Sequence, residues 1–442
     1  MKVRPDKQPR VNVVTLGCAK NQVDSENIAT QLRHACWQVV HDADVQEAEI
    51  VIVNTCGFID LAKAQSIETI LEFAQAKSEG RIRKLYVTGC LSQRYREELQ
   101  REIPEVDDWF GTMDLPMLLA RFQADYRHEL LGERQIMTPR HYAYLKISEG
   151  CNRTCSFCAI PLMRGKHVSR PIEELVAEAK YLAKHGTKEL ILIAQELTYY
   201  GLDRYKKRAL PELLHALADV PGVEWIRLHY AYPSKFPMKV LDVMAQRPEV
   251  CNYLDIPLQH AHDDVLTRMR RQITRAQTEQ LIHQIRERVP DITLRTTFLV
   301  GFPGETEEAF DALCHFVEEM EFDRVGVFQY SHEAQTRAYQ LPDDVPPHVK
   351  EARAQQLMRI QQQISLRKNL QKVGQTFKVL FDRLEDGYFV GRTEGDSPEV
   401  DNEVRVSARD HYVRVGDFAS VQIVEATEYD LYGRLVTIPP QT

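Results

Sequence analysis

Long apolar segments are absent from this chain of 442 residues. Its longest apolar runs, such as Leu190 to Ala194, have the length of a β-strand and are far too short to span a bilayer. The first residues, Met1 to Lys7, contain no apolar core and so do not form a signal peptide. We therefore expect a cytoplasmic protein with no membrane partner.

The chain also lacks an excess of basic residues. It has 56 Lys and Arg against 64 Asp and Glu, which gives a net charge of −8 near neutral pH. Because there is no overall basic signature, direct binding to nucleic acid is not expected. The contents of 43% apolar and 27% charged residues are those of an ordinary globular protein, and the length suffices for two or three domains.

Nine cysteines are present, an odd number that cannot all pair in disulfides. In a reducing cytoplasm, clustered cysteines indicate metal binding or catalysis instead. Cys151, Cys155 and Cys158 form a C-x3-C-x2-C pattern, and no fourth cysteine follows nearby. A four-iron four-sulfur cluster takes four ligands, so three thiolates leave one iron open to a substrate or cofactor. The pattern therefore indicates a reactive centre.

Zinc is a second interpretation of the same cysteines, because thiolates are soft ligands that also suit this metal. A structural zinc site would be closed by a fourth cysteine or histidine, and His141 and His167 are in range along the sequence. Phe157, directly before the last cysteine, either covers a cofactor or packs into the core.

Residues 1–130 alternate strand and helix signals, which predicts a doubly wound α/β domain. Buried parallel strands are predicted at 11–16, 50–53 and 84–88. A helix that begins near Asp24 follows the first of these strands, and a helix over 61–77 follows the second.

Three further cysteines each follow one of these strands. Cys18, Cys56 and Cys90 come just past the predicted carboxyl ends, where open α/β sheets bind ligands, and a glycine stands next to each. Glycine lets the backbone approach closely, so residues far apart in sequence can converge. The alternative is that the three are small packed thiols.

Residues 137–366 repeat a strand–helix pattern six times, which predicts a full or partial parallel βα barrel. The predicted strands are 143–147, 190–194, 225–228, 254–256, 293–300 and 324–328. The C-x3-C-x2-C loop follows the first strand, at the face of such a barrel where active sites lie. Thr274 and Gln277 have the spacing of a capping box at the start of a helix.

Residues 368–438 predict a third domain of a different kind. Short strands are predicted at 376–381, 388–392, 403–406, 418–425 and 434–436. Glycines mark the turns between these strands, and this pattern favours a small five-stranded β-barrel.

The spacing of the central triplet, with an aromatic residue before the last cysteine, resembles the radical S-adenosylmethionine superfamily. In that superfamily the open iron chelates S-adenosylmethionine, and one electron from the cluster cleaves it to a 5′-deoxyadenosyl radical. The resemblance implies that Cys151, Cys155 and Cys158 are catalytic cluster ligands. It also implies an electron donor such as flavodoxin or ferredoxin.

The resemblance narrows to the methylthiotransferases and covers nearly the whole chain in order. The motifs that carry it are 16–26, 53–59, 88–91, 164–171 and 300–306. It implies two [4Fe-4S] clusters, of which the amino-terminal one is held by Cys18, Cys56 and Cys90. It also implies a carboxyl-terminal TRAM domain for substrate, with S-adenosylmethionine used both as radical source and as methyl donor.

Two substrates are known for this family, a tRNA adenosine and an aspartate of small-subunit ribosomal protein twelve. Residues 140–150 and 428–433 resemble the type that modifies the protein, the RimO type. Charge gives a physical reason, since residues 371–442 hold 8 Lys and Arg against 13 Asp and Glu. An acidic module repels phosphate and favours a basic ribosomal protein, unless its charge serves only solubility.

Polar residues near the ends of the predicted barrel strands are candidates to bind S-adenosylmethionine. Gln195 ends the second strand, Gln259 lies beyond the fourth and Arg295 lies in the fifth. Together with Phe157 they are predicted cofactor contacts, although each is equally interpretable as an ordinary core or loop residue.

The sequence therefore predicts an enzyme that methylthiolates the β-carbon of an aspartate in ribosomal protein twelve. The resemblance implies that the radical removes a hydrogen from this carbon, which then takes a methylthio group from the first cluster. A tRNA adenosine methylthiotransferase is the alternative. A non-catalytic electron carrier is disfavoured because each cysteine set has three members and carriers usually complete four. A zinc-stabilised binding protein is the remaining rival.

Overall fold

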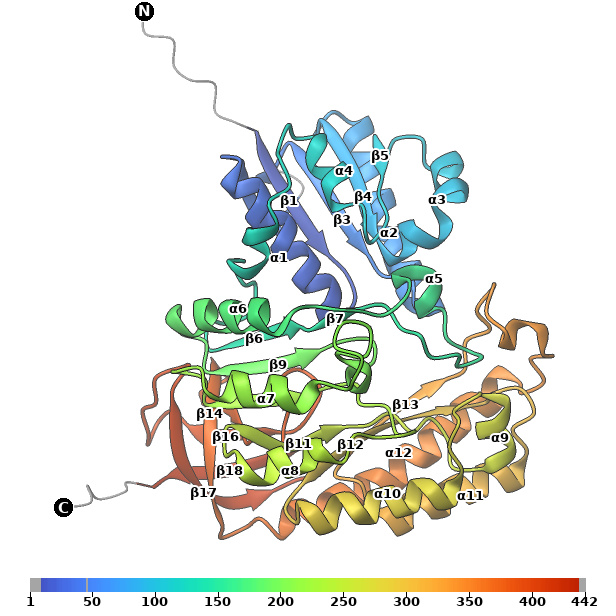
Figure 1. Cartoon of the computed structure of the whole chain (residues 1–442), viewed down its shortest axis with the longest axis vertical. Helices are drawn as coiled ribbons and strands as arrows, with labels where there is room; N and C mark the ends of the chain where they lie inside the picture. The colour runs from blue at the N-terminus through green and yellow to red at the C-terminus, as the bar shows by residue number, and fades with distance from the viewer. Residues whose placement is uncertain (1–8, 45–46, 437–442) are drawn as a thin grey trace, which may run out of the picture.

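The computed structural model describes residues 9–44 and 47–436. Figure 1 shows a blue amino-terminal part at the top, a central part that runs from green to orange, and a red barrel at the lower left. The predicted Met1 to Lys7 segment and the last two residues of the predicted third domain, 437–438, lie outside the described residues. Within the described ranges, no helix is both long and apolar enough to cross a membrane.

The amino-terminal part is built on a five-stranded parallel sheet in the order β2-β1-β3-β4-β5. Its elements are β1 (Arg10–Thr15), α1 (Ala19–His34), β2 (Gln38–His41), β3 (Ile50–Thr55), α2 (Asp60–Ser78), β4 (Lys84–Gly89), α3 (Cys90–Glu102), β5 (Asp108–Trp109) and α4 (Leu115–Ala120). All of β3 is buried because alternate residues face opposite layers. Val51 and Val53 pack with α2 and α3, whereas Ile50 and Ile52 pack with α1 and α4.

The first helix begins at Ala19, so the predicted start near Asp24 was wrong. The polar residues of the first turn resemble a loop in the sequence, but they are satisfied inside the protein. Asn21 is fully buried, and its amide donates to the carbonyl oxygens of Leu16 at 2.7 Å and Thr55 at 3.0 Å. These bonds join the first helical turn to the ends of two strands.

The central part contains a six-stranded parallel sheet in the order β13-β12-β11-β10-β9-β6. Its strands are β6 (Tyr142–Lys146), β9 (Glu189–Ile193), β10 (Trp225–Leu228), β11 (Val250–Asp255), β12 (Thr293–Val300) and β13 (Arg324–Gln329). The six strands predicted from the sequence are the six found. The sheet stays open between its edge strands β6 and β13, so the barrel is partial rather than full.

Helices cover one face of this sheet and enclose the largest apolar core. They are α6 (Ile172–Lys184), α7 (Leu210–Ala218), α8 (Lys239–Gln246), α10 (Arg275–Arg288), α11 (Glu307–Met320) and α12 (Pro347–Leu370). Two short helices, α5 (Ile160–Arg164) and α9 (Asp263–Arg268), pack outside this core. The capping box of Thr274 and Gln277 at the start of α10 is confirmed. A short hairpin, β7 (Ser148–Glu149) and β8 (Val168–Ser169), leaves the sheet after β6.

The carboxyl-terminal part is a closed five-stranded barrel in the order β14-β15-β16-β18-β17, as the sequence predicted. Its strands are β14 (Thr376–Glu385), β15 (Tyr388–Arg392), β16 (Glu403–Ser407), β17 (Phe418–Ala426) and β18 (Asp430–Leu435). The alternating inward residues of these strands form a separate apolar core.

The loop over residues 393–402, between β15 and β16, anchors the barrel on the central sheet. Asp396 pairs with Arg324 at 2.5 Å and Asp401 pairs with Arg295 at 3.2 Å. The side chains of both aspartates are almost completely buried. Buried carboxylates need such partners, so this loop fixes the barrel to the strands.

Breaking the buried pair by Arg324→Met is expected to lower the free energy of unfolding by about 3–5 kcal/mol, because Asp396 would stay buried without its partner. The double change Arg324→Met with Asp396→Asn should recover part of this loss. Denaturant unfolding of the purified chain measures both.

A matched control is the exposed pair of Lys378 and Glu224, which also joins the barrel to the central part. Lys378→Met should change stability by less than about 1 kcal/mol, because exposed ion pairs contribute little. Equal losses from Arg324→Met and Lys378→Met would contradict the anchoring role of the buried pair.

Candidate active site

The first three cysteines lie at the carboxyl ends of three neighbouring strands. Cys18 follows β1, Cys56 follows β3 and Cys90 follows β4. Cys18 caps α1 and Cys90 is the first residue of α3, so both thiols lie at helix amino termini, which favour a thiolate. The structure therefore brings these residues to one sheet edge, as the sequence indicated.

Two glycines allow the three cysteine-bearing loops to meet. Gly17 has a φ of +95°, and a Cβ atom there would lie 2.9 Å from Sγ of Cys56. Gly89 has a φ of +99°, and its added Cβ would lie 2.5 Å from the carbonyl oxygen of Thr55. Side chains at these positions are excluded by the conformation and by the contact. The loops approach each other only because both residues are glycine.

The second triplet lies in the loop after β7, at the carboxyl edge of the central sheet. The backbone N–H of Arg153 donates to Sγ of Cys151 at 3.4 Å. Sγ of Cys155 lies 3.4 Å from Nη1 of Arg271 and 3.6 Å from the hydroxyl of Tyr232. Two cationic residues and a phenol therefore surround this group of thiols.

The ring of Tyr232 is held between two guanidinium groups. That of Arg153 lies 3.8 Å from the ring centroid and that of Arg271 lies 4.2 Å from it. Arg153 is also paired with Glu196 at 3.0 Å, and Arg271 donates to the carbonyl of Pro257. These contacts hold positive charge beside the thiols, where it offsets the negative charge of thiolate ligands.

Arg164, the last residue of α5, joins the second triplet to the amino-terminal part. Its guanidinium donates to Asp24 of α1 at 2.6 Å and to Glu149 at 3.3 Å. It also donates to the side chain of Asn21. Because α5 directly follows the C-x3-C-x2-C loop, one buried side chain spans both cysteine-bearing regions.

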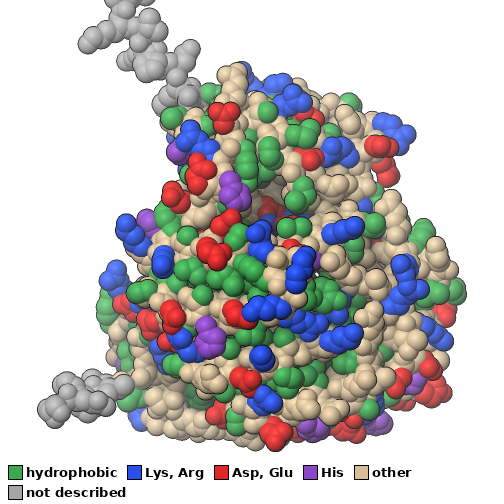
Figure 2. All heavy atoms as spheres, viewed as in Figure 1, with side chains coloured by type: hydrophobic (Ala, Val, Ile, Leu, Met, Phe, Trp, Pro, Cys, Tyr) green, Lys and Arg blue, Asp and Glu red, His purple; other side chains and the backbone are tan. Residues whose placement is uncertain are grey.

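Apolar packing brings the two triplets together at the same place. Cys90 of the first triplet packs with Ala159, which directly follows Cys158 of the second triplet, and with Met163 of α5. In the view of Figure 2, a hollow lies between the amino-terminal and central parts, and Lys and Arg side chains gather below it. The two sets of cysteines therefore face each other across a domain boundary.

The predicted cofactor contacts lie in different surroundings. Nε2 of Gln195 donates to Oε1 of Glu149 at 2.5 Å, directly beside the cysteine loop. Phe157 instead packs against Phe302, with ring centroids 6.4 Å apart. The backbone of Gln259, at a φ of +77°, pairs with β12 as an isolated bridge.

Arg295 faces the barrel rather than the cysteines. Its guanidinium lies 3.4 Å from Asp255 and 3.2 Å from Asp401 of the anchoring loop. The structure thus brings Gln195 to the cysteine loop, but it gives Arg295 a role in joining two domains.

Several residues around the thiols received no role from the sequence. They are Lys20, Asp24, Glu149, Arg153, Arg164, Tyr232 and Arg271. Lys20, Asp24, Glu149 and Arg164 stand within segments that resemble the family, so their position there was the available signal. Tyr232 and Arg271 lie far from any motif and reach the site only through the fold.

The two histidines considered as zinc ligands have other partners. His141 pairs with Asp382 at 2.8 Å and the ring of His167 bonds Ser169 at 3.0 Å. Across residues 9–44 and 47–436, no three His, Cys, Asp or Glu side chains are arranged around a single metal ion. A four-iron cluster binds each thiolate through a different iron, so its ligands need not converge on one point.

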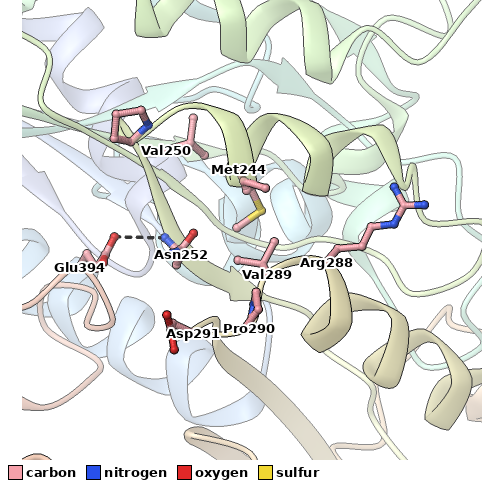
Figure 3. Close-up of a pocket in the computed structure, with 10 residues that line it drawn as sticks. Met244, Val250, Asn252, Arg288, Val289, Pro290, Asp291 and Glu394 are labelled. Atoms are coloured by element: carbon pink, nitrogen blue, oxygen red, sulfur yellow. Dashed lines mark hydrogen bonds between the residues drawn. The ribbon is translucent and has the colours of Figure 1, made fainter.

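A separate cavity of about 400 Å³ lies at the opposite, amino-terminal edge of the central sheet. Figure 3 shows its lining from the end of α8, the start of β11, the end of α10 and the anchoring loop. Asn252 of β11 donates from its backbone to Glu394 at 3.3 Å there. No cysteine lines this cavity, so it is not part of the thiol site.

Three family descriptions match consecutive parts of the chain. Residues 10–111 match the uncharacterized protein family UPF0004, residues 145–317 match the radical SAM superfamily and residues 373–436 match the TRAM domain. These segments correspond to the amino-terminal sheet, the central sheet with its cysteine loop and the closed barrel.

Among solved structures, similar folds occur at low sequence identity. The radical S-adenosylmethionine methyltransferase TsrM from Kitasatospora setae has a TM-score of 0.52 and 16% identity, covering 73% of this chain and 75% of that one. The cobalamin-dependent S-adenosylmethionine radical enzyme OxsB has a TM-score of 0.53 and 12% identity, covering 75% of this chain and 55% of that one. These likenesses establish the fold alone.

Curated relatives match over nearly the full length. The chain is 59% identical to the ribosomal protein uS12 methylthiotransferase RimO of Cytophaga hutchinsonii, covering 99% of this chain and all of the relative. It is 59% identical to that of Flavobacterium johnsoniae, with 98% and 99% covered, and 52% identical to that of Bacteroides fragilis, with 97% and 100% covered. Because identity and coverage are both high, the chain belongs to the RimO family of radical S-adenosylmethionine methylthiotransferases.

Proposed function

We propose that this protein is a radical S-adenosylmethionine methylthiotransferase that modifies ribosomal protein uS12. The full-length match to relatives named for this reaction carries the proposal. The facing positions of the two cysteine triplets support it, because sulfur insertion needs both groups near one substrate atom. The atom we propose is the β-carbon of an aspartate.

The enzyme uses two [4Fe-4S] clusters and S-adenosylmethionine, and its thiols have the chemistry to hold both clusters. We assign the first cluster to Cys18, Cys56 and Cys90 and the second to Cys151, Cys155 and Cys158. When bound, the second cluster and S-adenosylmethionine would supply the radical that abstracts a hydrogen, and the first cluster would supply the methylthio group. The donor set fits, because each triplet offers three soft ligands and leaves one iron open.

The protein's own residues shape and charge this site. Arg271 lies against Cys155, and the guanidinium of Arg164 lowers the pKa of the Cys90 thiol, against the larger raising effect of its burial. Both guanidinium groups are buried, so they stabilise thiolate ligands more strongly than exposed cations would. Gln195 is our proposed contact for S-adenosylmethionine, because its amide already lies at the cysteine loop through Glu149.

Three further residues are proposed contacts for S-adenosylmethionine. Phe157 packs against Phe302 close to the loop and can cover a bound cofactor from that side. Gln259 offers a side chain at a position whose backbone is fixed by β12. Arg295 can contact a cofactor only while it also holds Asp255 and Asp401.

We further propose where the enzyme works and with which partners. A ribosomal protein substrate places it in the cytoplasm. Reduction of the second cluster requires an electron donor, for which flavodoxin or ferredoxin is suited. A tRNA adenosine is the alternative substrate, and the relatives of 52–59% identity favour the protein instead.

The test offers the reduced, iron-loaded enzyme both uS12 and unmodified tRNA. We expect mass gain on uS12 alone, and mass gain on tRNA alone would contradict the substrate assignment. About eight irons per chain are expected after anaerobic loading.

Variants separate the two clusters. Cys155→Ala should abolish cleavage of S-adenosylmethionine and reduce the iron to about four per chain, because the first cluster remains. Cys90→Ala should remove a similar amount of iron and stop methylthiolation. Cys36→Ser, at an exposed cysteine outside both triplets, is the matched control and should retain all iron. One tightly bound zinc in place of iron would overturn the enzyme assignment.

Burial affects how these thiols bind iron. It raises the pKa of Cys90 and of Cys151 to about 11 and that of Cys158 to about 12. Below these values the cluster-free thiols are protonated, whereas iron binds thiolates. Assembly must therefore release protons.

Cluster loading is accordingly expected to become faster as pH rises from 7 to 9, because the thiolate fraction grows about tenfold per pH unit below the pKa. Anaerobic iron–sulfide loading followed by visible absorbance measures the rate, and a dye measures the protons released. A rate that is constant or falls over this range would contradict the role of thiol burial.

A further inference from the structure

Lys20 belongs to the amino-terminal part, but its side chain lies against the central part. It stands two residues after Cys18, in the first turn of α1, and only 9% of its surface is exposed. Its Nζ atom lies 3.1 Å from the centroid of the Tyr230 ring. The ammonium group is thus placed at the boundary where the two triplets face each other.

Tyr230 holds a fixed position at this boundary. It follows β10 and has a φ of +63°, which is unfavourable for a residue other than glycine. Its N–H donates to Asp255 at 3.1 Å and its carbonyl accepts from Leu197 at 3.1 Å. Two residues further on, Tyr232 touches Cys155. The contact between Lys20 and Tyr230 therefore joins a residue near Cys18 of the first triplet to a residue near Cys155 of the second.

Most cations beside the two triplets have carboxylate partners, whereas Arg271 lies against the thiol of Cys155. The pairs are Arg164 with Asp24 and Glu149, Lys146 with the same two carboxylates, and Arg153 with Glu196. Lys20 differs, because within the described residues its ammonium makes no ion pair or hydrogen bond and lies over the ring of Tyr230. A buried charge without a counter-ion is unfavourable, so this position is suited to an incoming anion.

Apolar side chains lie beside Lys20. Ala19, Tyr230 and the buried residues Val23, Tyr144 and Ile193 form one apolar cluster beside it. The amino terminus of α1 adds partial positive charge at the same place. An anion attached to a small apolar stem fits these surroundings, as the carboxylate of a short side chain does.

We propose that Lys20 binds the side-chain carboxylate of the substrate aspartate and thereby sets the specificity of the reaction. This inference rests on the proposed function, which makes an aspartate the reacting residue. In aspartate the carboxylate is attached directly to the β-carbon, so holding one positions the other between the triplets. An adenine base carries no negative charge and would leave Lys20 without a partner.

The test measures binding of two synthetic peptides to the iron-loaded enzyme under anaerobic conditions. One peptide carries the modified segment of uS12 with its aspartate, and the other has asparagine at that position. The wild-type enzyme should bind the aspartate peptide more tightly than the asparagine peptide. In Lys20→Met the Kd for the aspartate peptide should rise about 10- to 100-fold, whereas the Kd for the asparagine peptide should change little.

Lys180→Met is the matched control, because Lys180 is exposed on α6, a helix that carries none of the six cysteines. It should leave the preference for aspartate intact. If Lys20→Met does not retain its iron, Lys20→Gln takes its place, and Lys20→Arg should restore part of the preference because it keeps the charge.

The outcomes separate this inference from the proposed function. Loss of the preference for aspartate in the Lys20 variants, with the iron retained, supports it. Equal weakening of both peptides, or a preference that persists, overturns the role of Lys20 while methylthiolation of uS12 by the wild-type enzyme still stands. Failure of the wild-type enzyme to modify uS12 overturns both.

Discussion

The buried contact of Arg164 with Asp24, Glu149 and Asn21 is the interaction on which the site depends. Each cysteine triplet belongs to a different sheet, and neither sheet by itself fixes its distance to the other. A guanidinium group has five donors in a rigid plane, so it can hold residues of two domains in one arrangement. Without it, Asp24 and Glu149 would keep Lys146 as their cationic partner, but the link from α5 to Asn21 and Asp24 of α1 would be lost.

The opposite end of the central sheet is held by charges of similar kind. Glu189 of β9 lies between Arg227 and Arg392, and Arg392 continues to Asp382 of the barrel. Ion pairs of this kind mean that some acidic side chains of the barrel are not available to a partner. Asp396 and Asp401 are paired with arginines of the central sheet, so the net charge of the barrel overstates the negative charge that it offers to a partner. The protein substrate is therefore better supported by the relatives than by charge.

Much of the fold could be predicted from the sequence because its strands are short, apolar and regularly spaced. The six central strands and the five-stranded barrel were recognisable for this reason, and so were the cysteines at the sheet edge. The start of α1 was missed because Lys20 and Asn21 are polar yet buried, and local sequence does not show which distant group satisfies them. Tyr232 and Arg271 were missed for the same reason, since only the fold brings them to Cys155. Arg295 was predicted as a cofactor contact, but the sequence could not show that the loop over 393–402 engages it.

That loop has a consequence for how such enzymes can be recombined. The barrel has its own core and a closed sheet, so it resembles a unit that could be exchanged between relatives to change the substrate. Its anchoring loop, however, places Asp396 and Asp401 against Arg324 and Arg295 of the central strands. A transplanted barrel would bring buried carboxylates that require matching arginines in the new host. The barrel can therefore be exchanged between relatives only together with the part of the central sheet that its anchoring loop contacts.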